Sequence, residues 1–213
     1  MKKTILILSI MLILIFLEWC SRDEKVEEIV CVETEIIEIF NYRAEVKNLD
    51  ALRYIQTHTR KNEVSLDDAL LIVESVVKYN NTVLTTAEIL AILAQESEFN
   101  KNAVNRETKD FGLAQINLWT FREVCKENKL EYNVSLLFDV EYNIKIMMMV
   151  LKQKEKRITN RISMTTDDLR IALIMSYNAG VGGYFAEYHG RSESEYFKLI
   201  QWRLGILNKI DNM

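Results

Sequence analysis

The sequence predicts an all-α fold, in which a helical domain over residues 62–213 follows an N-terminal segment and a spacer. The 213-residue chain has no proline and only six glycines. Few tight turns are therefore expected, which favours helices joined by short loops. Four times, a Ser or Thr stands three residues before an acidic residue and ahead of an apolar run, a pattern typical of helix starts. These pairs are Ser65/Asp68, Thr85/Glu88, Thr165/Asp168 and Ser192/Glu195. We therefore expect a domain of about six helices.

Residues 1–20 have the features of a signal peptide or membrane anchor. Lys2 and Lys3 precede an uncharged apolar run over residues 4–17, which is the order of the charged and apolar regions in an export signal. A membrane-spanning helix needs about 20 apolar residues, so the run is short for one. We expect export across the cytoplasmic membrane and a location in the cell envelope, with the membrane as the partner of this segment.

The end of this segment leaves two forms of attachment open. Cys20 resembles the cysteine of a lipoprotein cleavage box, in which the new N-terminal cysteine is lipidated. Such boxes have small residues before the cysteine, whereas Glu18 and Trp19 stand there. A lipoprotein modified at Cys20 and an uncleaved anchor therefore both remain candidates.

Residues 21–61 are predicted to form an acidic, helical spacer. Residues 21–48 contain eight acidic and four basic side chains, and the whole chain has a net charge of −4. The domain that follows is therefore close to neutral and lacks the excess of basic residues that nucleic-acid binding needs. We expect no nucleic-acid partner.

The cysteines and histidines predict no metal site. Cys20, Cys31 and Cys125 are not spaced as zinc ligands are, and His58 and His189 have no Cys or carboxylate partner at a metal-binding spacing. A single disulfide between Cys31 and Cys125 is left open. Neither a metal nor another cofactor is expected.

Two further helices are predicted in the middle of the domain, over residues 118–128 and 141–156. The second has apolar residues at helical spacing, namely Ile144, Met147, Met148 and Leu151. Methionines in such a stripe usually fill a core, so we interpret them as packing residues rather than as a cofactor or partner groove.

Glu96 is the strongest candidate for a catalytic residue. It lies in the predicted helix over residues 87–99, seven, four and three positions after Ile89, Ile92 and Leu93, so it shares their apolar face. A carboxyl group in such surroundings should have a raised pKa and stay protonated near neutral pH. A general acid needs that property in order to donate a proton to a leaving oxygen.

Three motifs occur in a fixed order along the domain, the first two separated by a polar loop. They are Glu96-Ser97-Glu98-Phe99, Phe111-Gly112-Leu113-Ala114-Gln115-Ile116-Asn117 and Ser176-Tyr177-Asn178-Ala179-Gly180. This set closely resembles the lytic transglycosylases of the soluble-lytic-transglycosylase type, relatives of goose-type lysozyme, whose pattern is E-S-x-F, G-L-M-Q-I and Y-N-A-G. The resemblance covers residues 62–205 and implies a lysozyme-like helical domain that cleaves peptidoglycan.

The sequence departs from the family pattern at two positions. Ala114 stands where the family usually has Met, which would open the groove wall slightly. Lys101 stands where the family often has a proline, so the loop there is expected to be less rigid. Neither position is the acid itself.

The resemblance also implies a role for each matching residue. Glu96 would be the acid/base, Ser97 would orient it or the substrate, and Gln115 would hydrogen-bond a sugar in the cleft. Tyr177 and Asn178 would stand over the carboxyl group. For Gln115 and Asn178, hydrogen bonding within a loop or helix cap is the alternative interpretation.

The implied reaction uses one carboxyl group. Glu96 would protonate the oxygen between N-acetylmuramic acid and N-acetylglucosamine, and the C6 hydroxyl of the muramoyl sugar would then attack the anomeric carbon to give a 1,6-anhydro product. Asp110 is a candidate second carboxylate, since an Asp at that point resembles the specialised transglycosylases of secretion and conjugation machines; alternatively it is a turn residue. A second carboxylate would make hydrolysis plausible.

Two other functions remain open alongside this one. The first is a lysozyme-like peptidoglycan hydrolase, and the second is a non-catalytic envelope assembly protein on the same fold. The expected partners are peptidoglycan glycan strands, with secretion or envelope machinery as a further candidate. Wall turnover, secretion-apparatus assembly and phage-derived wall penetration all fit the sequence.

Overall fold

The computed structural model describes residues 50–56, 64–188 and 194–210 of the chain. All of these residues belong to one unit, which spans residues 48–213. The predicted N-terminal segment at residues 1–20, the spacer up to residue 49 and the helix-start residue Ser192 lie outside the described residues. The assignment of a leader, a spacer and a domain to these ranges stays a prediction.

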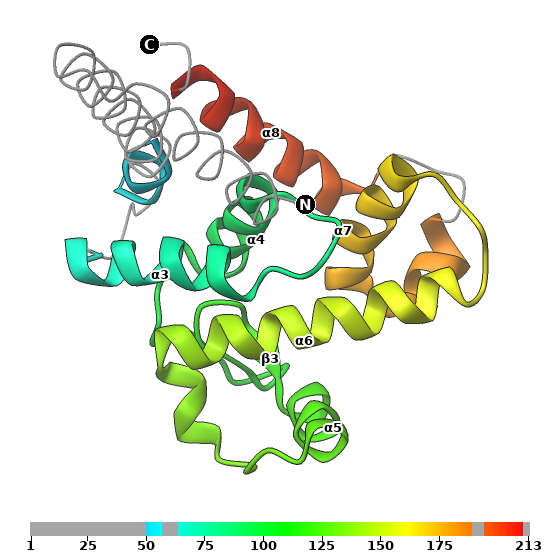
Figure 1. Ribbon diagram of the computed structural model, residues 1–213, viewed down its shortest axis with the longest axis horizontal. Coiled ribbons are helices and arrows are strands. Elements are labelled where there is room, and N and C mark those ends of the chain that lie inside the picture. The colour runs from blue at the N-terminus through cyan, green and yellow to red at the C-terminus, as the bar shows by residue number, and fades with distance from the viewer. Residues whose placement is uncertain (1–49, 57–63, 189–193, 211–213) are drawn as a thin grey trace, which may run out of the picture. The chain divides into compact units, whose positions relative to one another are not determined.

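Helices dominate the described residues, and the all-α class predicted from the sequence is confirmed (Figure 1). In chain order the α-helices are α3 (Leu66–Tyr79), α4 (Thr86–Ser97), α5 (Leu118–Asn128), α6 (Val140–Thr159), α7 (Thr166–Gly183) and α8 (Glu195–Ile210). A 3-10 helix, η1 (Val134–Phe138), precedes α6, and a π-helical segment, η2 (Tyr184–Tyr188), follows α7.

Three helices begin where the capping patterns predicted, whereas α8 begins at Glu195 with Ser194, not the predicted Ser192, accepting the Phe197 N–H at 3.0 Å. The Ser65 side chain accepts a hydrogen bond from the Asp68 backbone N–H at the start of α3, and Thr165 does the same for α7. At α4 the capping box is complete, because the Glu88 side chain also accepts from the Thr85 backbone N–H at 2.7 Å. Satisfied N–H groups of this kind fix the first turn of each helix.

Helix α6 lies at the centre of the domain and packs against α3, α5 and α7, whereas α4 packs against α3 and α8 (Figure 1). The α6 stripe predicted from the sequence is buried, with Ile144, Met147 and Leu151 at 0% exposure. Helix α4 is buried on almost all sides, from Glu88 to Ala94. The residues around Glu96 are therefore held by a helix that has little freedom to shift.

The N-terminal end of α4 is tied to α7 by a partly buried ion pair. Glu88 is 5% exposed, and Arg170 reaches it with Nη2 at 2.7 Å and Nε at 3.2 Å from its carboxylate oxygens. A two-pronged arginine–carboxylate contact fixes orientation as well as distance. The helix that carries Glu96 is thus anchored at its opposite end.

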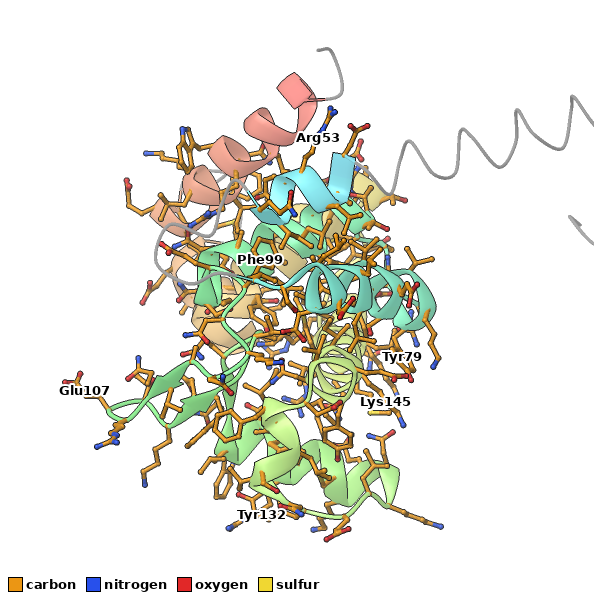
Figure 2. All side chains as sticks on the ribbon, turned by 90° about the vertical axis from the view of Figure 1, so that its left-hand side faces the viewer. Arg53, Tyr79, Phe99, Glu107, Tyr132 and Lys145 are labelled. Carbon is orange, nitrogen blue, oxygen red and sulfur yellow. The ribbon has the colours of Figure 1, made fainter. Side chains whose placement is uncertain are left out.

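A small antiparallel sheet occupies the region where the sequence predicted only a polar loop. Its strands are β1 (Val104–Asn105), β2 (Asp110–Phe111) and β3 (Ile116–Asn117), in the order β1-β2-β3. Strands of two residues are too short to produce an alternating pattern, so sequence periodicity could not reveal them. The β1–β2 turn projects from the helices, with Glu107 at its outer end (Figure 2).

Residues 50–56 form a helical segment that belongs to the same core, although the sequence assigned them to the spacer. Ala51, Tyr54 and Ile55 are buried, and the Tyr54 ring packs edge-on against Phe99 at 6.1 Å between centroids. The apolar positions follow a helical i, i+3, i+4 pattern, but the segment spans too few residues for this pattern to be distinctive.

Two candidate features are absent from the described ranges. Within residues 50–56, 64–188 and 194–210, no helix combines the length and the apolar character needed to cross a bilayer. The same ranges contain no group of three His, Cys, Asp or Glu side chains that could hold a metal ion.

Candidate active site

Glu96 lies in the last turn of α4, with its side chain directed into the protein as the apolar stripe predicted. Burial raises the pKa of its carboxyl group to about 7, and the negative charge of Asp110 acts in the same direction. The Tyr196 hydroxyl donates a hydrogen bond to Glu96 Oε1 at 2.6 Å, which lowers the pKa and offsets part of the effect of burial. At neutral pH the carboxyl group is therefore divided between its protonated and ionised forms.

The chain turns sharply directly after this helix. Glu98 and Phe99 both have left-handed backbone conformations, with φ of 50° and 59°, each of which costs a non-glycine residue roughly 1–2 kcal/mol. Phe99 is 2% exposed and its ring contacts Tyr54, so packing stabilises the turn. This turn ends α4 immediately beyond Glu96 and Ser97.

Ser97 joins the first motif to the second. Its hydroxyl donates to the carbonyl oxygen of Leu113 at 2.7 Å and lies 3.4 Å from the carbonyl oxygen of Leu93. The hydroxyl thus binds main chain on both sides of the site. Ser97 therefore holds the loop next to Glu96 and does not bond Glu96 itself.

Asn143 of α6 holds the second motif, and the sequence analysis did not single it out. Its Nδ2 donates to the carbonyl oxygens of Leu137 at 2.7 Å and Phe111 at 3.2 Å, while its Oδ1 accepts from the Ala114 N–H at 2.9 Å. The residue is 0% exposed. Its position directly before Ile144 of the buried α6 stripe could have indicated this role, because a buried amide requires hydrogen-bond partners.

Gln115 is used mainly within its own loop. Its backbone has a φ of 46°, and its Nε2 donates to the carbonyl oxygens of Gly112 at 2.9 Å and Ala103 at 3.3 Å. These contacts match the loop-bonding alternative that the sequence left open. A sugar contact by Gln115 stays a prediction.

Tyr177 stands beside the acid, as the resemblance implied, whereas Asn178 is exposed. The Tyr177 hydroxyl donates to the Ala114 carbonyl oxygen at 2.7 Å. Burial, followed by the charge of Glu96, raises the pKa of Tyr177 well above its ordinary value. Tyr177 thus forms part of the wall around Glu96 as a neutral group.

Helix α7 breaks just beyond these residues, at Gly180, where φ is 71° and ψ is 164°. Lys154 of α6 donates from Nζ to the Ser176 carbonyl oxygen at 2.7 Å, in the turn that precedes the break. A cation close to the carbonyl end of a helical segment is electrostatically favourable. Burial lowers the pKa of Lys154 to about 8.

Asp110 is a strand residue rather than a turn residue, and it is brought toward Glu96. It pairs in register with Asn105 and Asn117, so the three side chains share one face of the sheet. Asn117 Nδ2 donates to Asp110 Oδ1 at 2.9 Å, and the hydroxyl of Thr108 donates to Oδ2. Its charge raises the pKa of Glu96, so Asp110 lies near enough to act on the acid electrostatically.

Lys101, which stands where the family often has a proline, holds its loop to the domain by an ion pair. Its Nζ lies 2.9 Å and 2.8 Å from the two carboxylate oxygens of Asp68 on α3. The ion pair is partly exposed, so its contribution to stability is modest. It nevertheless restrains the loop that the sequence analysis expected to be less rigid.

Tyr196 is the contact of Glu96 that sequence reasoning missed, since α8 lies 100 positions further along the chain. Nothing in the sequence distinguishes it from an ordinary core aromatic of an amphipathic helix. Burial and the charge of Glu96 raise the pKa of Tyr196 well above its ordinary value, so it remains a hydrogen-bond donor. It is the only hydroxyl within the described residues that is seen to donate to Glu96.

Replacing Tyr196 by Phe should move the pKa of Glu96 upward, because the hydrogen bond that stabilises the ionised form is lost. We expect the alkaline limb of the activity profile to shift up by about one pH unit, measured as kcat/KM against pH. Tyr177→Phe is the matched control, since it removes a hydroxyl that bonds Ala114 instead of Glu96. Equal shifts in the two variants would contradict a specific effect of Tyr196.

The assembled site can perform acid/base chemistry with one buried carboxyl group. Glu96 can donate a proton from its neutral form and take one up from its ionised form, and two neutral tyrosines limit the access of water to it. The loop with the second motif is held by Ser97, Asn143 and Tyr177, which all bind its main chain or that of its neighbours. The three motifs therefore meet around a single acid.

Comparison with known families agrees with this arrangement. The family model described as "Transglycosylase SLT domain" matches residues 76–198, more than half of the chain. The matched range includes Glu96, Asp110, Gln115, Tyr177 and Tyr196. The chain has no match among the curated proteins. It belongs to the transglycosylase SLT domain family, and its function is of the lytic-transglycosylase type that acts on peptidoglycan.

Proposed function

We propose that this protein is a peptidoglycan lytic transglycosylase that cleaves the β-1,4 bond between N-acetylmuramic acid and N-acetylglucosamine and forms a 1,6-anhydromuramoyl end. One observation carries the proposal: a buried carboxyl group, Glu96, whose pKa is about 7 and which accepts a hydrogen bond from Tyr196. A group with this pKa can serve as acid and base at the same neutral pH.

In the proposed reaction the protonated Glu96 gives its proton to the glycosidic oxygen as the bond to the muramoyl C1 breaks. The 2-acetamido group of the muramoyl sugar stabilises the developing positive charge. The ionised Glu96 then takes the proton of the C6 hydroxyl while that oxygen bonds to C1, which returns the carboxyl group to its starting state. An intramolecular nucleophile is favoured over bulk water on entropic grounds, so no second acid is needed.

Hydrolysis is the second candidate, and the position of Asp110 favours it. Asp110, on strand β2, acts electrostatically on Glu96. In glycosidases with two carboxyl groups the second activates water or attacks the sugar directly. Asp110 is, however, already bound by Asn117 and Thr108, which supports a charge-setting role over a nucleophilic one.

Product analysis distinguishes the two candidates. The full chain is incubated with purified peptidoglycan, and the released muropeptides are identified by mass spectrometry. Anhydro ends, lighter by one water than reducing ends, are expected. Reducing ends would replace the proposed reaction with hydrolysis, and no release would leave a non-catalytic envelope role.

Asp110→Asn gives a second expected result. The variant should still form anhydro ends, and its alkaline limb should shift to lower pH, because the charge that raises the pKa of Glu96 is removed. Glu107→Gln, at the exposed β1–β2 turn, is the control for an acid lost elsewhere on the sheet (Figure 2). Loss of all product with Asp110→Asn would instead make Asp110 a participant in the chemistry.

The proposed substrate places the domain outside the cytoplasmic membrane. The N-terminal export features of residues 1–20 support this location. We propose that these residues deliver the domain to the cell wall and hold it there, through the membrane or a lipid on Cys20.

A further inference from the structure

Trp119 is the most exposed large hydrophobic side chain of the described residues, at 68%. It lies in the first turn of α5, two positions before Phe121, which is 0% exposed. Successive helix positions are rotated by about 100°, so Trp119 points away from the core into which Phe121 projects. An indole held in water by the fold gains most when a partner covers it.

The position of Trp119 is fixed by the sheet that carries Asp110. Asn117 pairs in register with Asp110 and donates to its carboxylate. The Oδ1 atom of the same Asn117 accepts the backbone N–H of Trp119 at 3.0 Å, which caps α5. Cross-strand partners lie about 5 Å apart and two residues span at most about 7 Å, so the Cα atoms of Asp110 and Trp119 are within roughly 12 Å.

Arg122 and Tyr132 lie near Trp119, on and beside α5. Arg122 is exposed, lies three positions after Trp119 and is therefore its neighbour on α5. Its guanidinium lies 5.3 Å from the centre of the Tyr132 ring, which packs on the buried Phe121 at 5.1 Å. Trp119 and the Arg122–Tyr132 pair thus lie near one another at α5, whose N-cap Asn117 is the strand partner of Asp110.

We propose that Trp119 is a sugar-stacking subsite for the glycan strand beyond the bond that is cleaved, and that Arg122 binds a carboxylate of the attached stem peptide. This inference rests on the proposed function, because it takes the peptidoglycan strand as the ligand. One face of a pyranose ring carries C–H groups, which pack against an indole, while its hydroxyls stay in water. A strand of several sugars would reach from Glu96 past Asp110 to Trp119.

The proposed subsite contributes to the binding of long strands and not to the chemical step. In this proposal Trp119 binds the strand beyond the bond that is cleaved, so its loss should raise KM on long strands and leave kcat unchanged. Arg122 is a fixed planar donor suited to a carboxylate, so its contribution requires a stem peptide. The two residues therefore predict separable effects on two forms of the same polymer.

Binding is measured with the full chain carrying Glu96→Gln, so that the polymer is not degraded. The probes are purified sacculi with stem peptides and sacculi from which an amidase has removed them. We expect Trp119→Ala to weaken binding to both by about tenfold, and Trp119→Phe to retain most of the affinity. Arg122→Gln should weaken binding only to the peptide-bearing form.

Trp202 provides the matched control, since it is an exposed tryptophan (53%) with an arginine, Arg203, 5.9 Å from its ring. It lies on α8, which is at the opposite end of the domain from α5 (Figure 1), and Trp202→Ala should bind like the parent. Equal losses for the Trp119 and Trp202 variants, or none for Trp119→Ala, would overturn the subsite while the parent still binds. A parent that neither binds sacculi nor, with Glu96 intact, releases muropeptides would overturn the proposed function and the subsite together.

Discussion

Glu96→Gln is expected to lower the rate of muropeptide release by about a thousandfold. Glutamine has nearly the same size as glutamate and can still accept a hydrogen bond from Tyr196, so the site should keep its shape. It can neither give a proton to the glycosidic oxygen nor retrieve one from the C6 hydroxyl. Release of labelled fragments from purified sacculi measures the rate, and activity within tenfold of the parent would exclude Glu96 as the acid.

The same substitution should make the folded protein more stable above neutral pH. A carboxyl group with a pKa near 7 when folded and near 4.5 when unfolded binds more protons in the folded state between these values. Folding stability therefore falls by about 3 kcal/mol as pH rises through that interval. Glutamine has no such dependence, because it carries no charge to desolvate.

Urea unfolding at pH 5 and pH 8 tests this expectation. The free energy of unfolding of Glu96→Gln should exceed that of the parent at pH 8, and the difference should shrink at pH 5, where the parent carboxyl group is largely protonated. Glu98→Gln, two positions further on, is the control for a change of charge at the same helix end. A parent no less stable than Glu96→Gln at pH 8 would contradict the raised pKa.

Gly112→Ala is expected to cost about 3 kcal/mol or more of folding stability. A methyl group at this position would lie 2.1 Å from the Leu137 carbonyl oxygen and 2.2 Å from Asn143 Nδ2, well inside van der Waals contact. The backbone φ of +74° is also unfavourable for any side chain. Relief would require both η1, which carries Leu137, and the Asn143 side chain to move, which would break the hydrogen bonds of Asn143 to the loop.

Gly205→Ala is the matched control for this prediction. Gly205 lies in α8, its added methyl would meet open space, and an alanine there should stabilise the helix by about 0.5–1 kcal/mol. The two variants add the same methyl group with opposite expected signs. Denaturation midpoints measure both, and a Gly112→Ala midpoint equal to that of the parent would show that the close packing around Gly112 is absent.

The sequence predicted the parts of the site that depend on one helix or one motif. Glu96 projects inward because of its spacing from Ile92 and Leu93, and a period of 3.6 residues is readable from the chain alone. The capping pairs at Thr85 and Thr165 were readable for the same reason, since the interacting atoms are three residues apart.

The contacts that could not be predicted join distant segments. Tyr196 and Asn143 reach the site from α8 and α6, and their partners lie 100 and 29 positions away. Packing of whole helices decides such pairs, and no local pattern records it. The strand position of Asp110 was missed for another reason, because strands of two residues depend on pairing rather than on their own sequence.

The hydrogen bond from Tyr196 to Glu96 has a consequence for the order in which the site is assembled. During synthesis Tyr196 leaves the ribosome after the acid and all three motifs. Until α8 packs against α4, Glu96 lacks this donor and one wall of its surroundings. A nascent or truncated chain that contains all three motifs but lacks α8 therefore has an incomplete site around Glu96, and the site is completed only when α8 packs against α4.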